Sequence, residues 1–198
     1  MQNRPMLYIK RALDLIGSAC GLLLLSPVFL VIYVGLKLST SGSAIFSQER
    51  IGLGGKPFRI YKFRTMVVNT EEDGIPQLAE ANDERLTRFG KFLREHHLHE
   101  LPQLWNVLRG DMSFVGYRPE RKYFIDKIME IRPDYAELYS IRPGTTSMAT
   151  LYNGYTNTMG KMLRRLDMDL EYLHNQSLWL DFKIVFKTFV SIIFGRKF

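Results

Sequence analysis

The chain has 198 residues, a net charge of +7 and a sequence pI of about 9.5. This length is enough for one domain with a hydrophobic core, and the excess of Lys and Arg favours anionic partners such as lipid headgroups, nucleotide diphosphates or nucleic acid. The single cysteine, Cys20, excludes an intramolecular disulfide, which agrees with a reducing compartment.

The N-terminal part of the chain contains a long apolar segment. No charged residue occurs in the 22 positions from Leu15 to Leu36, and a helix that crosses a bilayer needs about 20 residues. The segment is too long for a cleaved signal peptide, and no clear cleavage site follows it. Basic residues flank it on both sides, so the charge bias gives no clear spanning orientation.

The dipeptide Ser26-Pro27 lies near the middle of this segment. Because Pro27 has no N–H, the Leu23 carbonyl loses its helical partner and a kink is expected. The Ser26 hydroxyl can satisfy a freed backbone group at the bend. The pattern alone leaves two interpretations open: a kinked helix that spans the membrane, or a hairpin that enters and returns on one side.

Two segments after this region have the composition of β-strands. Ile45–Arg50 and Phe58–Arg64 are separated by a glycine-rich turn, which predicts a β-hairpin. The basic residues of the second strand are explained equally well by a solvated or membrane-facing strand and by contact with substrate phosphates. The polar residues 67–82 that follow are predicted to form a surface loop.

Two helices are predicted on either side of a histidine-rich stretch. The first covers residues 82–94, with Asn82 or Asp83 as its N-cap. The second runs from about His99 to Arg109, because apolar residues repeat there at helical spacing and Gly110 follows as a C-cap.

The stretch between these helices contains three of the four histidines of the chain, followed by Glu100. The assignment puts His99 and Glu100 at the N-terminal end of the second helix, where unpaired N–H groups attract anions, phosphate above all. Taken as a pattern only, an ordinary amphipathic helix with a charged cap is the simpler interpretation. A zinc site formed by His96, His97, His99 and Glu100 is less favoured, because their spacing matches no established zinc motif.

The C-terminal half is predicted to be helical. One helix is expected over Glu120–Tyr139, interrupted at Arg132-Pro133, and another over Leu163–Leu173. The segment Leu178–Phe198 is rich in aromatic and aliphatic residues but is interrupted by lysines, which is typical of a helix that lies at a membrane surface. A helix packed on the core is the alternative.

The run from Glu100 to Glu120 reads Glu-Leu-Pro-Gln-Leu-Trp-Asn-Val-Leu-Arg-Gly-Asp-Met-Ser-Phe-Val-Gly-Tyr-Arg-Pro-Glu. It resembles the signature of the bacterial sugar transferases, which are monotopic polyprenol-phosphate phosphoglycosyl transferases. The resemblance departs at His99, where the family carries the aspartate presumed to be its covalent nucleophile, and at Tyr117, where proline is usual.

The resemblance implies an α/β fold that is mostly helical, with a small β-hairpin and amphipathic interfacial helices. It also implies a re-entrant N-terminal membrane helix broken at Ser26 and Pro27. We therefore expect residues 1–40 to form the re-entrant helix and residues 41–198 to form the transferase domain, with a C-terminal interfacial helix. The expected location is the cytoplasmic face of the bacterial inner membrane.

In the family, the nucleophile attacks the nearer phosphate of a UDP-sugar, UMP leaves, and a polyprenol phosphate (undecaprenyl phosphate) collects the phosphosugar. By resemblance, His99 and Glu100 are expected to be catalytic, and Glu100 is expected to bind Mg²⁺. Asp169 matches a recurrent aspartate of the family. Substrate phosphates are expected to contact four basic residues: Arg118, Arg142, Lys62 and Arg85. The expected partners are these two substrates and membrane lipid, without nucleic acid, and a homodimer is left open.

His99 leaves three outcomes open. Its neutral imidazole can act as the nucleophile, the chain can be a naturally silent relative that scaffolds a partner, or the histidine can be an introduced substitution that traps substrate. Besides an active transferase and a silent relative, a membrane-tethered nucleic-acid binder is a further possible function, suggested by charge alone. It is disfavoured because the basic residues are spread out and lack a recognisable reading motif.

Overall fold

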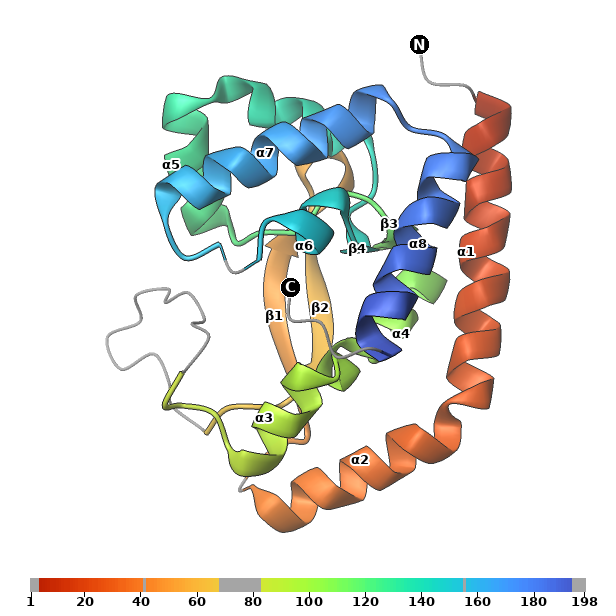
Figure 1. Cartoon of the computed structure of the whole chain (residues 1–198), viewed down its shortest axis with the longest axis vertical. Coiled ribbons are helices and arrows are strands. Elements are labelled where there is room, and N and C mark those ends of the chain that lie inside the picture. The colour runs from red at the N-terminus through yellow and green to blue at the C-terminus, as the bar shows by residue number, and fades with distance from the viewer. Residues whose placement is uncertain (1–3, 41, 68–82, 155, 194–198) are drawn as a thin grey trace.

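The computed structural model describes residues 4–193 except 41, 68–82 and 155. The loop predicted at 67–82 therefore lies almost entirely outside the described residues. The described chain is mostly helical, with one antiparallel hairpin and one pair of very short parallel strands (Figure 1). This confirms the mostly helical α/β class expected from the sequence.

Two helices, α1 (Arg4–Leu24) and α2 (Ser26–Ser39), form the N-terminal part and meet at a bend of 60°. Ser26 Oγ donates a hydrogen bond of 2.8 Å to the Leu23 carbonyl, the group that Pro27 leaves without a helical donor. The predicted break is confirmed. None of the described helices alone is long and apolar enough to cross a membrane, and these two reach the required length and composition only as a bent pair.

Polar contacts hold α1 against the rest of the chain. Lys10 forms an ion pair with Asp181 of α8 (Leu178–Ile193), with 2.5 Å between Nζ and Oδ2. Arg11 donates to the backbone carbonyls of Val107 and Leu108 at 2.7 and 3.0 Å. Because these carbonyls belong to the last turn of a helix, the guanidinium of Arg11 supplies donors that the helix itself lacks.

Apolar contacts hold α2. Ile32 and Leu36 are buried in a hydrophobic cluster shared with the hairpin and with α3 (Arg88–Glu95). Gly35 faces Phe89 of α3 so closely that a Cβ at this position would lie 2.9 Å from the ring. The glycine therefore allows α2 to approach α3 more closely than any other residue type would.

The predicted hairpin is present as β1 (Ile45–Ile51) and β2 (Pro57–Phe63). The strands pair antiparallel, with Ile45 opposite Phe63 and Ile51 opposite Pro57. Phe63 is buried in the cluster under α2, while Lys62, its neighbour on the opposite face, lines a pocket. The alternation of a strand thus separates core from pocket.

The helix predicted over residues 82–94 begins later than predicted. Thr87, not Asn82 or Asp83, is the N-cap of α3, and its hydroxyl accepts the N–H of Gly90. Asp83 instead accepts hydrogen bonds from the backbone N–H and the guanidinium of Arg85. A side chain already bonded within its own turn does not cap a helix, which is why this acidic start signal was misleading.

The single helix predicted over His99–Arg109 is also wrong at its start. Leu98–Glu100 forms a 3-10 turn, and α4 (Gln103–Arg109) begins only after Pro102. The predicted C-cap is confirmed, since Gly110 has φ of 94° and donates to the carbonyls of Asn106 and Val107. His99 and Glu100 therefore belong to a separate turn and not to the N-terminal end of a long helix.

The C-terminal half packs around the largest hydrophobic cluster. The predicted interruption at Arg132-Pro133 is present, because α5 (Lys122–Ile131) is followed by a 3-10 helix (Pro133–Ser140). Two strands of three residues, β3 (Ser113–Val115) and β4 (Gly144–Thr146), pair in parallel. Helices α6 (Met148–Tyr152) and α7 (Met159–His174) follow. Buried side chains from these elements and from the segment after β3 contribute to the cluster: Val115, Tyr117, Ile125, Ile128, Leu138, Leu166 and Tyr172.

The final helix, α8, runs beside α1 in the fold (Figure 1). One side of it contacts the domain, since Ile184 and Asp181 are buried. The other side exposes a row of stacked aromatic rings: Trp179, Phe182 and Phe186. Packing on the core is thus confirmed for one face of the helix, and contact of the other face with a membrane stays a prediction.

Candidate functional site

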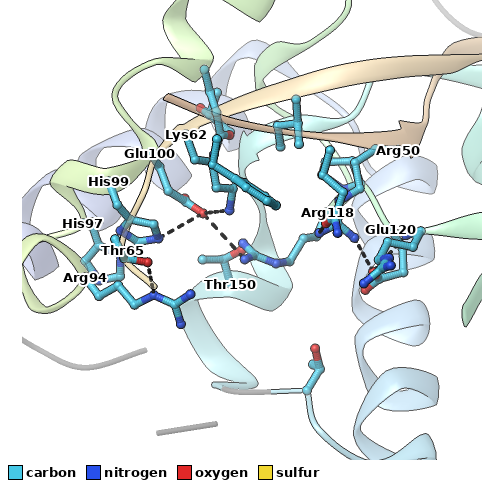
Figure 2. A pocket seen from close by; sticks show the side chains of 18 of the residues that line it. Arg50, Lys62, Thr65, Arg94, His97, His99, Glu100, Arg118, Glu120 and Thr150 are labelled. Atoms are coloured by element: carbon cyan, nitrogen blue, oxygen red, sulfur yellow. Dashed lines mark hydrogen bonds and ion pairs between the residues drawn. The ribbon is translucent and has the colours of Figure 1, made fainter. Parts of the chain in front are cut away.

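A pocket of about 320 Å³ lies between β2, the 3-10 turn at Leu98–Glu100 and the segment that follows β3. Five of the residues expected from the sequence to act at a site line it, although they come from four separate segments of the chain (Figure 2). They are Lys62, Arg85, His99, Glu100 and Arg118.

Glu100 is the centre of this group. Its Oε1 lies 2.5 Å from Lys62 Nζ, 3.6 Å from a guanidinium nitrogen of Arg118 and 3.7 Å from His99 Nε2 (Figure 2). Burial alone would raise the pKa of Glu100, but Lys62 and Arg118 hold it well below its usual range. The carboxylate is therefore ionised, and it interacts with two cations, Lys62 and Arg118.

Lys62 responds to the same surroundings in the opposite sense. Burial lowers the pKa of its ammonium group to about 8, although Glu100 acts against this shift. The Lys62 side chain is thus charged at neutral pH but loses its proton within the mildly alkaline range. A cation of this kind can neutralise a phosphate oxygen and can also be discharged when its carboxylate partner is occupied elsewhere.

His99 is held as a neutral imidazole. Burial lowers its pKa to about 3, so the ring carries a single proton at neutral pH. Nδ1 lies 3.4 Å from the Leu93 carbonyl, and a carbonyl can only accept a hydrogen bond. In the tautomer that donates to this carbonyl the proton is on Nδ1, and the lone pair of Nε2 is then on the side of Glu100 and the pocket.

The remaining pocket wall is strongly basic. Arg85 forms a two-pronged contact with Asp83 at 2.7 and 2.8 Å, and Arg94 Nε donates to Thr65 Oγ1 at 2.9 Å. Among the lining residues that the structure describes, arginines and lysines far outnumber carboxylates. Such a cavity favours anionic ligands, and forked guanidinium groups suit phosphate in particular.

Two of the expected residues lie elsewhere. Arg142 does not line the pocket; its Nε donates to the Gly110 carbonyl at 2.8 Å, at the end of α4. The structure therefore does not group Arg142 with the pocket residues, and its contact with a substrate phosphate stays a prediction. Asp169 is buried in α7, where its Oδ2 accepts the backbone N–H of Arg118 at 3.3 Å. Burial raises the pKa of Asp169 to about 7, and its contact supports the segment that carries Arg118.

A second ion network in the pocket wall was not anticipated from the sequence. Glu120 accepts hydrogen bonds from Arg50 at 2.7 Å and from Arg165 at 3.0 Å. These residues come from β1 and α7 and from the end of the signature-like run. No local pattern links them, because the three positions are 45 or more residues apart. His97, which also lines the pocket, was noticed only as part of the zinc alternative.

The pocket residues suit Mg²⁺ better than zinc. Among the described residues, no three His, Cys, Asp or Glu side chains are grouped so that they could hold a metal ion, which removes the zinc alternative there. Mg²⁺ needs less, because it is commonly bound through one or two carboxylates together with substrate phosphates. Glu100 fits this minimal requirement, provided that Lys62 moves away from Oε1.

The sequence matches the family described as bacterial sugar transferase over residues 5–195. It is 41% identical to a UDP-N-acetylgalactosamine-undecaprenyl-phosphate N-acetylgalactosaminephosphotransferase of Aeromonas hydrophila, over 95% of this chain and 44% of that protein. It is 44% identical to a UDP-glucose:undecaprenyl-phosphate glucose-1-phosphate transferase of Caulobacter vibrioides, over 93% of this chain and 69% of that protein.

Several relatives are much longer than this chain. It spans 44% of the Aeromonas protein and 39% of a UDP-glucose:undecaprenyl-phosphate glucose-1-phosphate transferase of Klebsiella pneumoniae, to which it is 41% identical over 92% of its own length. The matched region nevertheless covers all the described elements from α1 to α8 except the first residue of α1. The chain belongs to the bacterial sugar transferase family.

Proposed function

We propose that the chain transfers a phosphosugar from a UDP-sugar to a polyprenol phosphate, with release of UMP, as the first membrane step in the assembly of a glycan. The observation that carries this proposal is the basic pocket around Glu100, in a chain whose relatives are named for undecaprenyl-phosphate sugar transfer. Both substrates are anionic and one is a lipid, which suits a positive pocket and exposed apolar helices.

In this proposal His99 is the nucleophile. Nε2 attacks the phosphorus next to the sugar, an Nε2–P bond forms, and the bond from phosphorus to the UMP oxygen breaks as UMP leaves with the electron pair. The proton remains on Nδ1, and this N–H donates a hydrogen bond to the Leu93 carbonyl. An oxygen of the polyprenol phosphate then attacks the same phosphorus, and the electron pair of the N–P bond returns to Nε2.

The charged groups around His99 have supporting roles. Lys62 and Arg118 would neutralise the phosphate oxygens, since both already contact the carboxylate at the centre of the pocket. Arg85, which also lines the pocket, would contact phosphate as well. Glu100 would hold Mg²⁺, which when bound supplies further positive charge to the phosphate oxygens.

We also propose that the protein is monotopic, on the cytoplasmic face of the bacterial inner membrane. The buried face of α2 packs against α3, which carries several charged residues and therefore cannot follow α2 through a bilayer. The 60° bend between α1 and α2 is compatible with a re-entrant arrangement. The apolar residues left exposed would contact lipid: Leu23, Leu24, Leu30, Val31 and Leu38 on the pair, and Trp179, Phe182, Phe186 and Phe189 on α8.

A silent relative that binds the same ligands is the second candidate. The histidine at position 99 favours it, because an imidazole replaces the aspartate that the family uses and cannot add a second carboxylate beside Glu100. Such a protein would retain the basic pocket and its ligands but would not release UMP.

The two candidates are separated by assaying UMP release from a panel of UDP-sugars with detergent-solubilised protein, polyprenol phosphate and Mg²⁺, beside the His99→Asp variant. Histidine catalysis predicts UMP release and a sugar-phosphate adduct that is labile in acid and resistant to hydroxylamine. The aspartate variant should form an adduct that hydroxylamine cleaves. Retained UDP-sugar binding without UMP would favour the silent candidate, and equal turnover of both proteins would rule out a catalytic role for the side chain.

A further inference from the structure

His97 is the residue at which the chain leaves α3 and enters the turn that holds His99 and Glu100. Its φ of 54° and ψ of 11° lie in the left-handed region. Within the described part of the chain, every other residue with positive φ is a glycine, including Gly110 at the end of α4. His97 is thus the one described position where a side chain is kept in a conformation that favours glycine.

The backbone at this position would be served as well by glycine. The N–H of His97 donates to the Arg94 carbonyl, and its own carbonyl accepts the N–H of Glu100. Both contacts are independent of the side chain, and glycine is the usual residue where a helix ends in this way. Histidine is tolerated there better than most residues, but a conformation that disfavours the side chain persists at functional sites when the side chain is needed.

The side chain of His97 lines the pocket, on the same side as His99 (Figure 2). The centroids of the two imidazole rings are 6.4 Å apart. Burial lowers the pKa of His97, Arg118 and Lys62 lower it further, and Glu100 acts in the opposite direction. The ring is therefore close enough to sense the charges around Glu100, and at neutral pH it can donate one hydrogen bond without adding to the charge of the pocket.

The neighbouring His96 provides the contrast. It is exposed, its ring packs 4.4 Å from that of Phe92, and its Nδ1 lies 2.9 Å from the Phe92 carbonyl. It is absent from the pocket wall. Of these two adjacent histidines only His97 lines the pocket, because the left-handed turn directs its side chain into the cavity.

We infer that the imidazole of His97 binds a phosphate group of a substrate in the pocket, a role that goes beyond turning the chain after α3. The inference rests on the proposed function and deepens it. The basic wall selects an anionic ligand, and phosphate oxygens accept hydrogen bonds from imidazole N–H groups. The phosphate comes from the nucleotide sugar or from the lipid acceptor, and these two sources share the same chemistry.

The experiment compares His97→Gly and His97→Asn with the control His96→Ala. Binding of UDP and of a short-chain polyprenol phosphate is titrated calorimetrically to the full chain in detergent, and thermal unfolding is followed in parallel. Because no turnover is required, the result does not depend on whether His99 catalyses the transfer. Failure of the proposed function would appear separately, as missing UMP release in the assay above.

We expect the affinity of His97→Gly for one of the two ligands to fall about tenfold, the effect of one lost hydrogen bond to a charged group, and the melting curve shows whether the variant is folded. A loss for UDP assigns the contact to the donor, and a loss for the lipid phosphate assigns it to the acceptor. His97→Asn, which tolerates the same backbone, should lose less, and His96→Ala should bind both ligands like the parent.

Unchanged affinity of His97→Gly for both ligands would overturn the inference and leave His97 as a turn residue only. An equal loss in His96→Ala would overturn it as well, since that side chain does not reach the pocket. If the glycine variant does not fold, His97→Ala, which also removes the donor, carries the test under the same two criteria.

Discussion

Glu100 and Glu120 lie in the same basic region, and each is an ionised carboxylate between cations (Figure 2). Their partners differ in kind. Glu120 accepts close hydrogen bonds from two arginines and from the Arg121 N–H, whereas Glu100 has one close contact, to a lysine, and two of 3.6 Å or more. Arginine remains charged in proteins, while a buried lysine can release its proton.

This difference indicates that Glu120 supports the fold, whereas Glu100 can take part in the reaction. Burial would raise the pKa of Glu120, but Arg165 and Arg50 lower it to about 2, so the group is charged and fully engaged. Glu100 is less tightly satisfied, and its lysine can adjust to a new ligand. A saturated network maintains geometry, and an unsaturated one can exchange partners during a reaction.

The largest effect is expected from Glu120→Gln. The change removes the carboxylate charge and leaves Arg50 and Arg165 buried without an anionic partner, which should lower the free energy of unfolding by about 3–5 kcal/mol. Chemical denaturation of the detergent-solubilised protein measures this. The matched control is Asp126→Asn, which breaks an exposed pair with Lys122 and should leave stability unchanged within error. A small effect of Glu120→Gln would erase the distinction between the two networks.

Glu100→Gln should show the reverse pattern. Its shape is preserved, and Lys62 can discharge once the carboxylate charge is gone, so the unfolding temperature should change little. UMP release should fall about 100-fold or more, as expected when a preorganised charged group at a reacting centre is lost. The measurement is the initial rate of UMP release at saturating UDP-sugar, beside a melting curve. A large loss of stability would show that Glu100, like Glu120, mainly supports the fold.

The pKa of Lys62 sharpens the comparison through pH. Because the folded-state pKa is lowered to about 8 from 10.5, the unfolded chain binds more protons between these values, and this group makes stability rise with pH in that window. Activity should move in the other direction, falling about tenfold per unit above pH 8 as the phosphate-contacting charge is lost. In Lys62→Arg the alkaline fall should disappear, because a guanidinium stays charged. A parent profile that is flat from pH 7 to 10 would exclude a role for the Lys62 charge.

These contrasts also mark what could be predicted from the sequence. The break at Ser26-Pro27, the hairpin and the C-cap at Gly110 follow from local chemistry, and all three are confirmed. The grouping of Lys62, His99, Glu100 and Arg118 came from resemblance, and the pocket brings them together. The network of Glu120 with Arg50 and Arg165 depends on tertiary packing between distant segments, so no spacing in the sequence reveals it.

The errors have the same physical origin. Asp83 has the composition of an N-cap, but its bond to Arg85 removes it from that role. The apolar spacing from Leu101 onward is helical, yet the left-handed residue at His97 and the proline at position 102 divide the segment into a 3-10 turn and a shorter helix. Periodicity reports which residues face the core, and it does not report where one turn ends and the next begins.

The smallest effect on activity is expected from a substitution of Arg142, which tests whether this residue belongs to the substrate site. Arg142→Gln should leave the KM for UDP-sugar unchanged, because its guanidinium contacts the Gly110 carbonyl and not the cavity. Loss of that hydrogen bond should lower the free energy of unfolding by about 1–2 kcal/mol. Arg118→Gln is the matched variant and should raise KM, since Arg118 points toward Glu100 from the pocket wall. If both substitutions raised KM equally, the substrate site would have to include the end of α4. The contacts of a cation in the structure would then no longer tell whether it supports the fold or binds substrate.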